Sequence, residues 1–214
     1  MNMNFNILKN NRGFTRTPKF GVSLQSQRGF TLVETLVAIS ILSLSIAATF
    51  TAAQSGIQNS TVAKDQTTAF YLAQEVMEYI KNVRDENALH SIKFPDAPRS
   101  WLHGIASVAG DPCHFGKVCK IDIPLKTVTN CGSAAITTNP PNLCPVIKQD
   151  PVTNLFGYFS GWTDTRFKIE IQLRNIVSDV EVEVVITISW VSRAGAKFFQ
   201  ASETLFNRQS MTEE

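Results

Sequence analysis

An acidic residue stands directly before a long apolar segment. Glu34 is followed by Leu36–Ala53 (LVAISILSLSIAATFTAA), in which every residue is apolar, small or weakly polar. No charged residue and no histidine occurs from Thr35 to Ala63. A carboxylate at mid-membrane depth costs about 2.5–3.5 kcal/mol on insertion scales, and less near the interface. Glu34 is therefore a functional candidate, and its first requirement is a partner of opposite charge.

The residues just before Glu34 suggest how that partner could arise. The sequence from Gln27 to Glu34 reads QRGFTLVE. A cut after Gly29 would create a positive α-amino group at Phe30, four residues from Glu34. One helix can hold both charges within a turn, or Glu34 can meet the terminus of the next subunit. Glycine suits the position before a scissile bond, because without a Cβ it leaves the backbone open to a protease.

This junction resembles the class III signal of type IV pilins and type II secretion pseudopilins. The resemblance rests on Arg28–Glu34 (RGFTLVE) followed by a hydrophobic helix, and it covers about residues 27–85. It implies that a prepilin peptidase cuts after Gly29 and methylates Phe30. It also implies that Glu34 neutralises the N-terminus of a neighbouring subunit during assembly. Its implied partners are the peptidase, other pilin or pseudopilin subunits and an inner-membrane assembly platform.

The charge distribution and the length of the apolar segment predict a single membrane span. An eighteen-residue helix covers about 27 Å, close to the roughly 30 Å of a hydrocarbon core. Residues 1–29 contain five basic and no acidic residues, although the whole chain has a net charge of only +2. The positive-inside rule then keeps the N-terminus in the cytoplasm and places the chain from about Gln54 outside the inner membrane. A basic leader on a mildly acidic body argues against a nucleic-acid partner.

Three other interpretations of the apolar segment compete. A secretory signal peptide would be cut near Ala48–Ala53, but its apolar core is usually shorter. A signal anchor of a bitopic protein fits the length. A buried helix of a soluble protein fits least, since nothing else in the chain is apolar enough to surround it. None of the three explains Glu34.

The helix is expected to continue beyond the membrane over residues 54–87. This segment contains no proline and one glycine, and apolar residues recur at spacings of three and four. We expect that stripe to pack on a globular domain, with charged residues such as Asp65 on the opposite face and a favourable Glu78–Lys81 pair. The stripe comprises Phe70, Ala73, Met77, Ile80 and Val83/Arg84.

The remainder predicts an irregular region and then a sheet. Residues 88–165 hold eight of the nine prolines and all four cysteines, with short strands expected only at Val118–Ile123 and Leu125–Thr129. Residues 166–206 alternate apolar and polar positions, which predicts an antiparallel meander with one bulge near Val184, and residues 207–214 form a tail. The fold class is α+β: a long N-terminal helix, membrane-spanning over 30–53 and amphipathic over 54–87, packed on a C-terminal antiparallel sheet.

The four cysteines predict two disulfides, because an even number lies in a loop-rich region placed outside the cytoplasm. They are Cys113, Cys119, Cys131 and Cys144. Three connectivities are open, of which the sequential one, Cys113–Cys119 with Cys131–Cys144, is favoured. A zinc site aided by His103 and His114 is the alternative, but no C-x2-C pair supports it.

No catalytic constellation is present, so the chain is not expected to be an enzyme or to need a cofactor or metal. The sequence lacks G-x-S-x-G, P-loop, H-E-x-x-H and Rossmann patterns. Asp150, Asn154 and Asp164 could contribute to a calcium loop, but their spacing fits no EF-hand. The sequence therefore indicates a structural subunit, most similar to minor type IV pilins. The alternatives are a secretion pseudopilin and a bitopic anchor with an extracytoplasmic binding domain that never polymerises.

Overall fold

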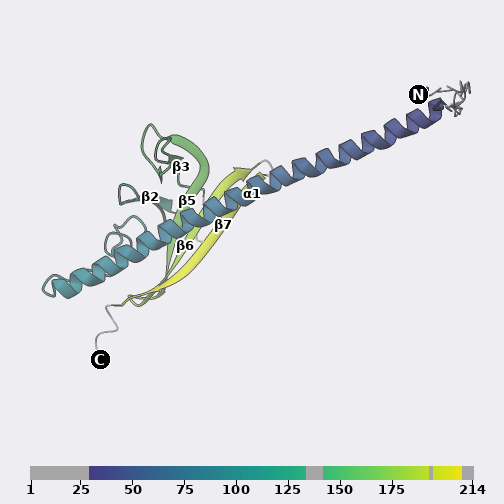
Figure 1. Cartoon of the computed structure of the whole chain (residues 1–214). Helices are drawn as coiled ribbons and strands as arrows, with labels where there is room; N and C mark the ends of the chain where they lie inside the picture. Colours follow the sequence, from purple (N-terminus) through teal and green to yellow (C-terminus); the bar gives the residue numbers. More distant parts are fainter. Residues whose placement is uncertain (1–28, 134–141, 193–194, 209–214) are drawn as a thin grey trace, which may run out of the picture. The chain divides into compact units, whose positions relative to one another are not determined.

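The computed structural model describes residues 29–133, 142–192 and 195–208, so the expected leader up to residue 28 and the end of the tail from residue 209 lie outside the described residues. The chain divides into two compact units, residues 1–52 and 53–214. The described residues form one helix and seven strands (Figure 1): α1 (Leu32–Lys93), β1 (Lys117–Asp122), β2 (Thr127–Ser133), β3 (Val146–Gln149), β4 (Phe156–Gly157), β5 (Thr163–Val177), β6 (Glu181–Ser192) and β7 (Gly195–Phe206). This is the predicted α+β fold.

Helix α1 is longer than expected at its C-terminal end. It has 62 residues and ends at Lys93, six residues beyond the predicted end at Asn87. No residue between these two positions breaks a helix, whereas Pro95 restricts Phe94 and cannot donate a backbone hydrogen bond. The amide of Phe94 makes the last bond, to the His90 carbonyl at 2.8 Å. The effective stop signal is therefore the proline.

The face of α1 that packs on the sheet differs from the predicted stripe. Ala73, Met77, Ile80 and Arg84 are buried as expected, but Phe70 is 52% exposed. Asp65, which was expected on the solvent face, is buried instead. The apolar positions that were missed are Ala69, Leu72 and Val76. The buried face is thus rotated toward Ala69, Leu72 and Val76.

All strand pairings in the sheet are antiparallel. β5 is the central strand: one edge pairs with β6 along its length, and β6 pairs with β7. The other edge of β5 pairs with β3 near its start and with β1 at Ile171, and these strands carry β4 and β2 respectively. The predicted bulge near Val184 is wrong, since the register shift lies on β5 between Asn175 and Val177.

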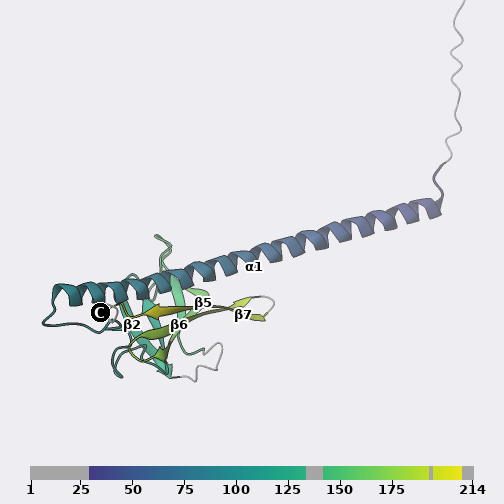
Figure 2. The ribbon, with the colours of Figure 1, turned by 90° about the horizontal axis from the view of Figure 1, so that it is seen from below.

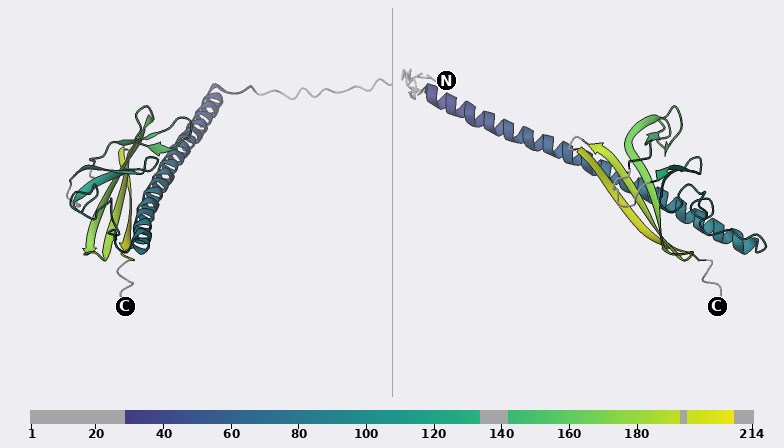
Figure 3. Two further views of the ribbon diagram at one scale, coloured as in Figure 1. Left: turned by 90° about the vertical axis from the view of Figure 1, so that its left-hand side faces the viewer. Right: turned by 180° about the vertical axis from the view of Figure 1, so that it is seen from behind.

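One face of the sheet packs against the part of α1 that follows residue 53 (Figures 2 and 3). Ile80 of the helix is fully buried with alternate residues of β5, such as Ile169 and Ile171, and of β6, such as Ile186. Alternation places these strand side chains on one face. Burying branched aliphatic side chains of this size contributes about 1.5–3 kcal/mol each. This seam is the hydrophobic core of the unit.

The region 88–165 is less irregular than predicted, because it contributes four strands. β1 matches the expected strand at Val118–Ile123 to within one residue at each end. β2 begins at Thr127 rather than Leu125, because Lys126 has a positive φ of 53° and belongs to the turn that its amide closes on the Ile123 carbonyl. β3 and β4 were not anticipated.

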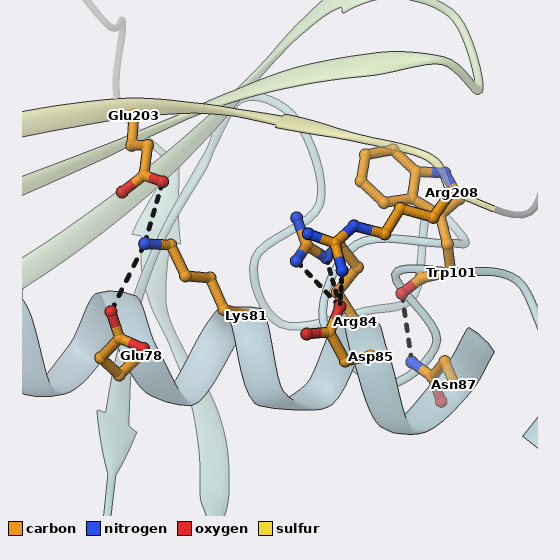
Figure 4. Close-up of polar contacts among 8 residues, drawn as sticks. All are labelled: Glu78, Lys81, Arg84, Asp85, Asn87, Trp101, Glu203 and Arg208. Atoms are coloured by element: carbon orange, nitrogen blue, oxygen red, sulfur yellow. Dashed lines mark hydrogen bonds and ion pairs between the residues drawn. The ribbon is translucent and has the colours of Figure 1, made fainter. Parts of the chain in front are cut away.

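Polar contacts fasten the C-terminal half of α1 to the other elements (Figure 4). Lys81 forms the predicted ion pair with Glu78 at 3.4 Å and a shorter one with Glu203 of β7 at 2.9 Å. The Glu203 carboxylate raises the pKa of Lys81 above its ordinary value, which favours the charged form. The buried Asn87 amide donates to the Trp101 carbonyl at 3.2 Å and so fixes the segment that follows the helix.

Candidate processing and assembly site

The first turn of α1 is capped by a side chain whose role the sequence analysis missed. The amide of Glu34 donates to Thr31 Oγ1 at 3.2 Å, and α1 begins at Leu32. Thr31 is therefore the N-cap and Glu34 the third helical residue, which is the spacing of a capping box. The signal was available as T-x-x-E in the sequence. Glu34 thus has a local structural role besides any role in assembly.

The position of Glu34 also has an electrostatic consequence. The N-terminus of a helix carries a partial positive charge, and a carboxylate in the first turn is stabilised by it. A free amine at Phe30 would add a positive charge one residue before the cap, where the same dipole disfavours it. Glu34 is the only acidic residue in the first turn of α1. It can therefore compensate both the dipole and a new α-amino group.

The expected scissile bond is accessible and lies outside the helix. Gly29 and Phe30 precede the first helical residue by three and two positions and have no regular secondary structure. Phe30 is 78% exposed. A Cβ added at Gly29 would meet no atom within 4 Å, so glycine is not required there by the chain's own packing.

The side chains in the apolar part of α1 are exposed. The window with a mean hydropathy of 2.1 is not buried at all, and α1 is the one helix among the described residues that is long and apolar enough to cross a membrane. Its large side chains, from Leu36 to Phe50, are each at least 51% exposed. A helix that is apolar on all sides requires lipid or other helices around it.

Four hydroxyl groups of this segment donate to carbonyls of the same helix. Ser40 donates to the Leu36 carbonyl at 2.8 Å, and Thr51 donates to the Ala47 carbonyl at 2.9 Å. Ser45 and Thr49 bond the preceding turn in the same way. Because an unsatisfied polar group in hydrocarbon costs several kcal/mol, these bonds make the serines and threonines compatible with a membrane.

The comparisons with known proteins agree with this geometry. Residues 24–50 match the family model of the prokaryotic N-terminal methylation motif. The chain carries this methylation motif. It is a class III signal peptide, typical of type IV pilins and pseudopilins, and the matched residues include the Gly29–Phe30 bond, Glu34 and the first part of the apolar helix. No curated protein and no solved structure matches the chain.

The prediction of two disulfides is confirmed. Cys113 is joined to Cys119 and Cys131 to Cys144, which is the sequential pairing. The first disulfide lies in the core beside β1, with Cys113 and Cys119 fully buried. The second joins β2 to the segment before β3. All four thiols are thereby used, so the zinc alternative has no thiolate ligand.

Asp150 and Asn154 share one turn, in which the Asn154 amide donates to the Asp150 carbonyl at 3.0 Å. Among the described residues, no three acidic, histidine or cysteine side chains form a group that could hold a metal ion. Asp150 instead accepts hydrogen bonds from the Val152 amide and the Thr153 hydroxyl, which lower the pKa of its carboxyl. Asp164 lies 3.5 Å from Lys148 in an ion pair.

His90, near the end of α1, is in an environment that disfavours its charged form. Partial burial is the largest cause, and the pKa of its imidazole is lowered below the ordinary 6.5. The nearby positive or ionisable groups act in the same direction, and they are Arg99, His103 and Lys93. Its Nδ1 atom is buried and has no hydrogen-bond partner among the residues that the structure describes. The lowered pKa of His90 favours its neutral form.

Proposed function

We propose that this chain is the precursor of a minor type IV pilin-like structural subunit. A prepilin peptidase cuts it after Gly29 and methylates Phe30, and the mature chain comprises residues 30–214. It is held in the inner membrane by the apolar part of α1, with its N-terminus in the cytoplasm, and it joins a fibre through the same segment. Its role is structural, and it needs no cofactor.

One observation carries this proposal. The methylation motif coincides with a non-helical, exposed bond that directly precedes a capped helix whose apolar residues are bare. A plain membrane anchor needs the apolar helix, and in it Glu34 would serve only the first turn of that helix. A subunit that leaves lipid for a protein core does need one, because the charge of a new α-amino group must find an opposite charge there.

The exposed state of the apolar segment supports assembly through packing. Association of helices in lipid is driven by close packing and by interhelical hydrogen bonds, and small residues allow close approach. The segment from Ala47 to Ala53 contains four alanines and no charged residue. Neighbouring subunits can therefore approach α1 closely at these alanines without burying an unpaired charge.

The test is mass spectrometry of the chain expressed together with a prepilin peptidase. We expect a chain that begins with N-methylated Phe30. The matched variant is Gly29→Val, which the fold tolerates because a Cβ at this position contacts nothing. We expect this variant to keep its leader and to remain in the membrane. Gly56→Val, on the exposed side of α1 where a Cβ also meets nothing, should be processed normally.

The outcomes separate the proposal from its alternatives. A processed chain in sheared surface fibres supports the pilus subunit. A processed chain that is absent from fibres and copurifies with a secretion apparatus would instead indicate a type II secretion pseudopilin. A chain that keeps its leader, or that is cut near Ala48–Ala53, would contradict processing at Gly29 and favour a non-polymerising anchor or a secreted domain.

A further inference from the structure

A buried glutamate on the sheet accepts hydrogen bonds from backbone amides. Glu170 of β5 is 1% exposed. Its neighbours Ile169 and Ile171 belong to the core under α1, so alternation places Glu170 on the opposite face of the sheet. Among the described residues it forms no ion pair. A carboxylate buried in this way is costly unless hydrogen bonds replace its water.

The hydrogen bonds come from three consecutive amides. Asn142 donates at 2.8 Å, Cys144 donates at 2.9 Å, and Leu143 between them also donates to the same carboxylate. Asn142 has a positive φ of 56°. A left-handed residue turns successive N–H groups toward the same side, which makes the concave anion site known as a nest. Here the anion is a side chain of the same protein.

The segment that forms the nest is connected both to β2 and to β5. Cys144 donates the third amide bond, and its sulfur is joined to Cys131 of β2. Leu143 also approaches β2, because a Cβ added at Gly132 would lie 3.5 Å from Leu143 Cδ1. β2 pairs with β1, and β1 pairs with β5 at Ile171, next to Glu170. The disulfide and the carboxylate therefore hold the same short segment from two sides.

Lys168 completes the arrangement. It lies two residues before Glu170 on β5, and its ammonium donates to Asn142 Oδ1 at 2.7 Å. Val146, which follows the segment, pairs with Lys168 in the β3–β5 ladder. The backbone of residues 142–144 is thus positioned by polar contacts to β5 that do not involve sulfur. We expect these contacts to favour a position of Cys144 near Cys131 in the reduced chain as well.

We propose that the hydrogen bonds of Glu170 to residues 142–144 and the formation of the Cys131–Cys144 disulfide are thermodynamically coupled. In this exchange the thiols of Cys131 and Cys144 react with one molecule of oxidised glutathione. The products are the protein disulfide and two molecules of reduced glutathione, which carry the two thiol protons. Glu170 favours the product because it binds the amide geometry in which the two sulfurs are adjacent. By linkage, the factor by which Glu170 favours the disulfide equals the factor by which the disulfide favours the nest. Reduction loosens residues 142–144, and oxidation outside the cytoplasm completes this face of the sheet.

The test measures the equilibrium constant for each disulfide in the full chain. The purified protein in detergent micelles is equilibrated with glutathione buffers, quenched with acid, alkylated and mapped by mass spectrometry. The variant is Glu170→Gln, which keeps the side-chain shape but leaves one acceptor oxygen and no charge. We expect the constant for Cys131–Cys144 to fall at least tenfold, about 1.4 kcal/mol, and that for Cys113–Cys119 to change less than threefold.

A matched control separates the nest from a general loss of charge. Glu183 of β6 is a partly buried glutamate of the same sheet that pairs with Arg174 at 3.3 Å. Glu183→Gln should leave the ratio of the two constants unchanged. Unchanged constants in Glu170→Gln would overturn the proposal, and so would equal falls in both constants, which indicate general destabilisation.

The reverse measurement serves if Glu170→Gln does not fold. Hydrogen exchange is followed in the double variant Cys131→Ser/Cys144→Ser. We expect exchange of the amides of residues 142–144 to rise at least tenfold, whereas Cys113→Ser/Cys119→Ser should not selectively affect them. Unaltered protection of these amides in the first double variant would show that the disulfide and the nest are independent.

Discussion

Arg166→Met should destabilise the protein more than Asp65→Asn, although both remove the same ion pair. Asp65 of α1 lies 3.0 Å from Arg166 of β5, and the two side chains differ in exposure, at 8% for Asp65 and 50% for Arg166. Losing the arginine leaves a buried carboxylate without its cation. Losing the carboxylate leaves an arginine that water can still solvate. The asymmetry follows from exposure alone.

The magnitude follows from the same exposures. Breaking a fully buried pair costs about 3–5 kcal/mol, whereas exposed pairs contribute about 0–1 kcal/mol. Because half of the arginine is hydrated, we expect about 2 kcal/mol for Arg166→Met and about 1 kcal/mol for Asp65→Asn. With an m-value of about 2 kcal/mol/M, the larger effect lowers the urea midpoint by about 1 M.

The assay is urea unfolding of the full chain in detergent micelles, followed by the fluorescence of the buried Trp101 and Trp190. Lys64→Gln is the control, because Lys64 is the exposed neighbour of Asp65 on the same helix turn. It should change the free energy of unfolding by less than about 0.5 kcal/mol. Equal costs for the two variants, or a larger cost for Asp65→Asn, would show that Asp65 is not buried against β5 as described.

Three further outcomes are expected. Glu34→Gln keeps a side chain that a capping box accepts but removes its charge. Processing should therefore persist, while the amount of chain in sheared fibres falls several-fold. The control Glu86→Gln, on the exposed surface of the same helix, should assemble normally. Ile80→Ala removes a fully buried side chain and should lower the free energy of unfolding by about 2–5 kcal/mol; a loss below 1 kcal/mol would contradict the seam between α1 and the sheet. The pKa of His90 is lowered in the folded protein, so the neutral imidazole contributes to the free energy of unfolding. This contribution is complete above the ordinary pKa of 6.5 and is lost as the pH falls through the lower folded-state pKa. His90→Gln should therefore lose less stability than the wild type between pH 7 and pH 5 in urea titrations, and parallel losses would refute a role for this imidazole.

The N-terminal features could be read from the chain because each depends on local chemistry. The Arg28–Glu34 junction, the apolar run and the absence of proline from residues 30–94 act within a few helical turns. The capping role of Thr31 depends on a spacing of three residues and was equally available. Likewise, alternation in β5 to β7 specified strands, because one face of each is committed to a core.

The tertiary structure decided which residues meet across long separations. No local signal distinguishes Asp65 from the exposed charges near it, since its burial depends on Arg166, 101 residues later. Phe70 satisfied the helical period, but the sheet approaches α1 beside Ala69 and Ala73 instead. β3 and β4 are too short to show a pattern, and they exist because the open edge of β5 supplies their partners. Glu170 reads as one more polar residue in an alternating strand, and only the fold brings three amides to it. Sequence alone determined the elements that depend on near neighbours along the chain, whereas the pairing of buried charges required the three-dimensional arrangement that removes water from them.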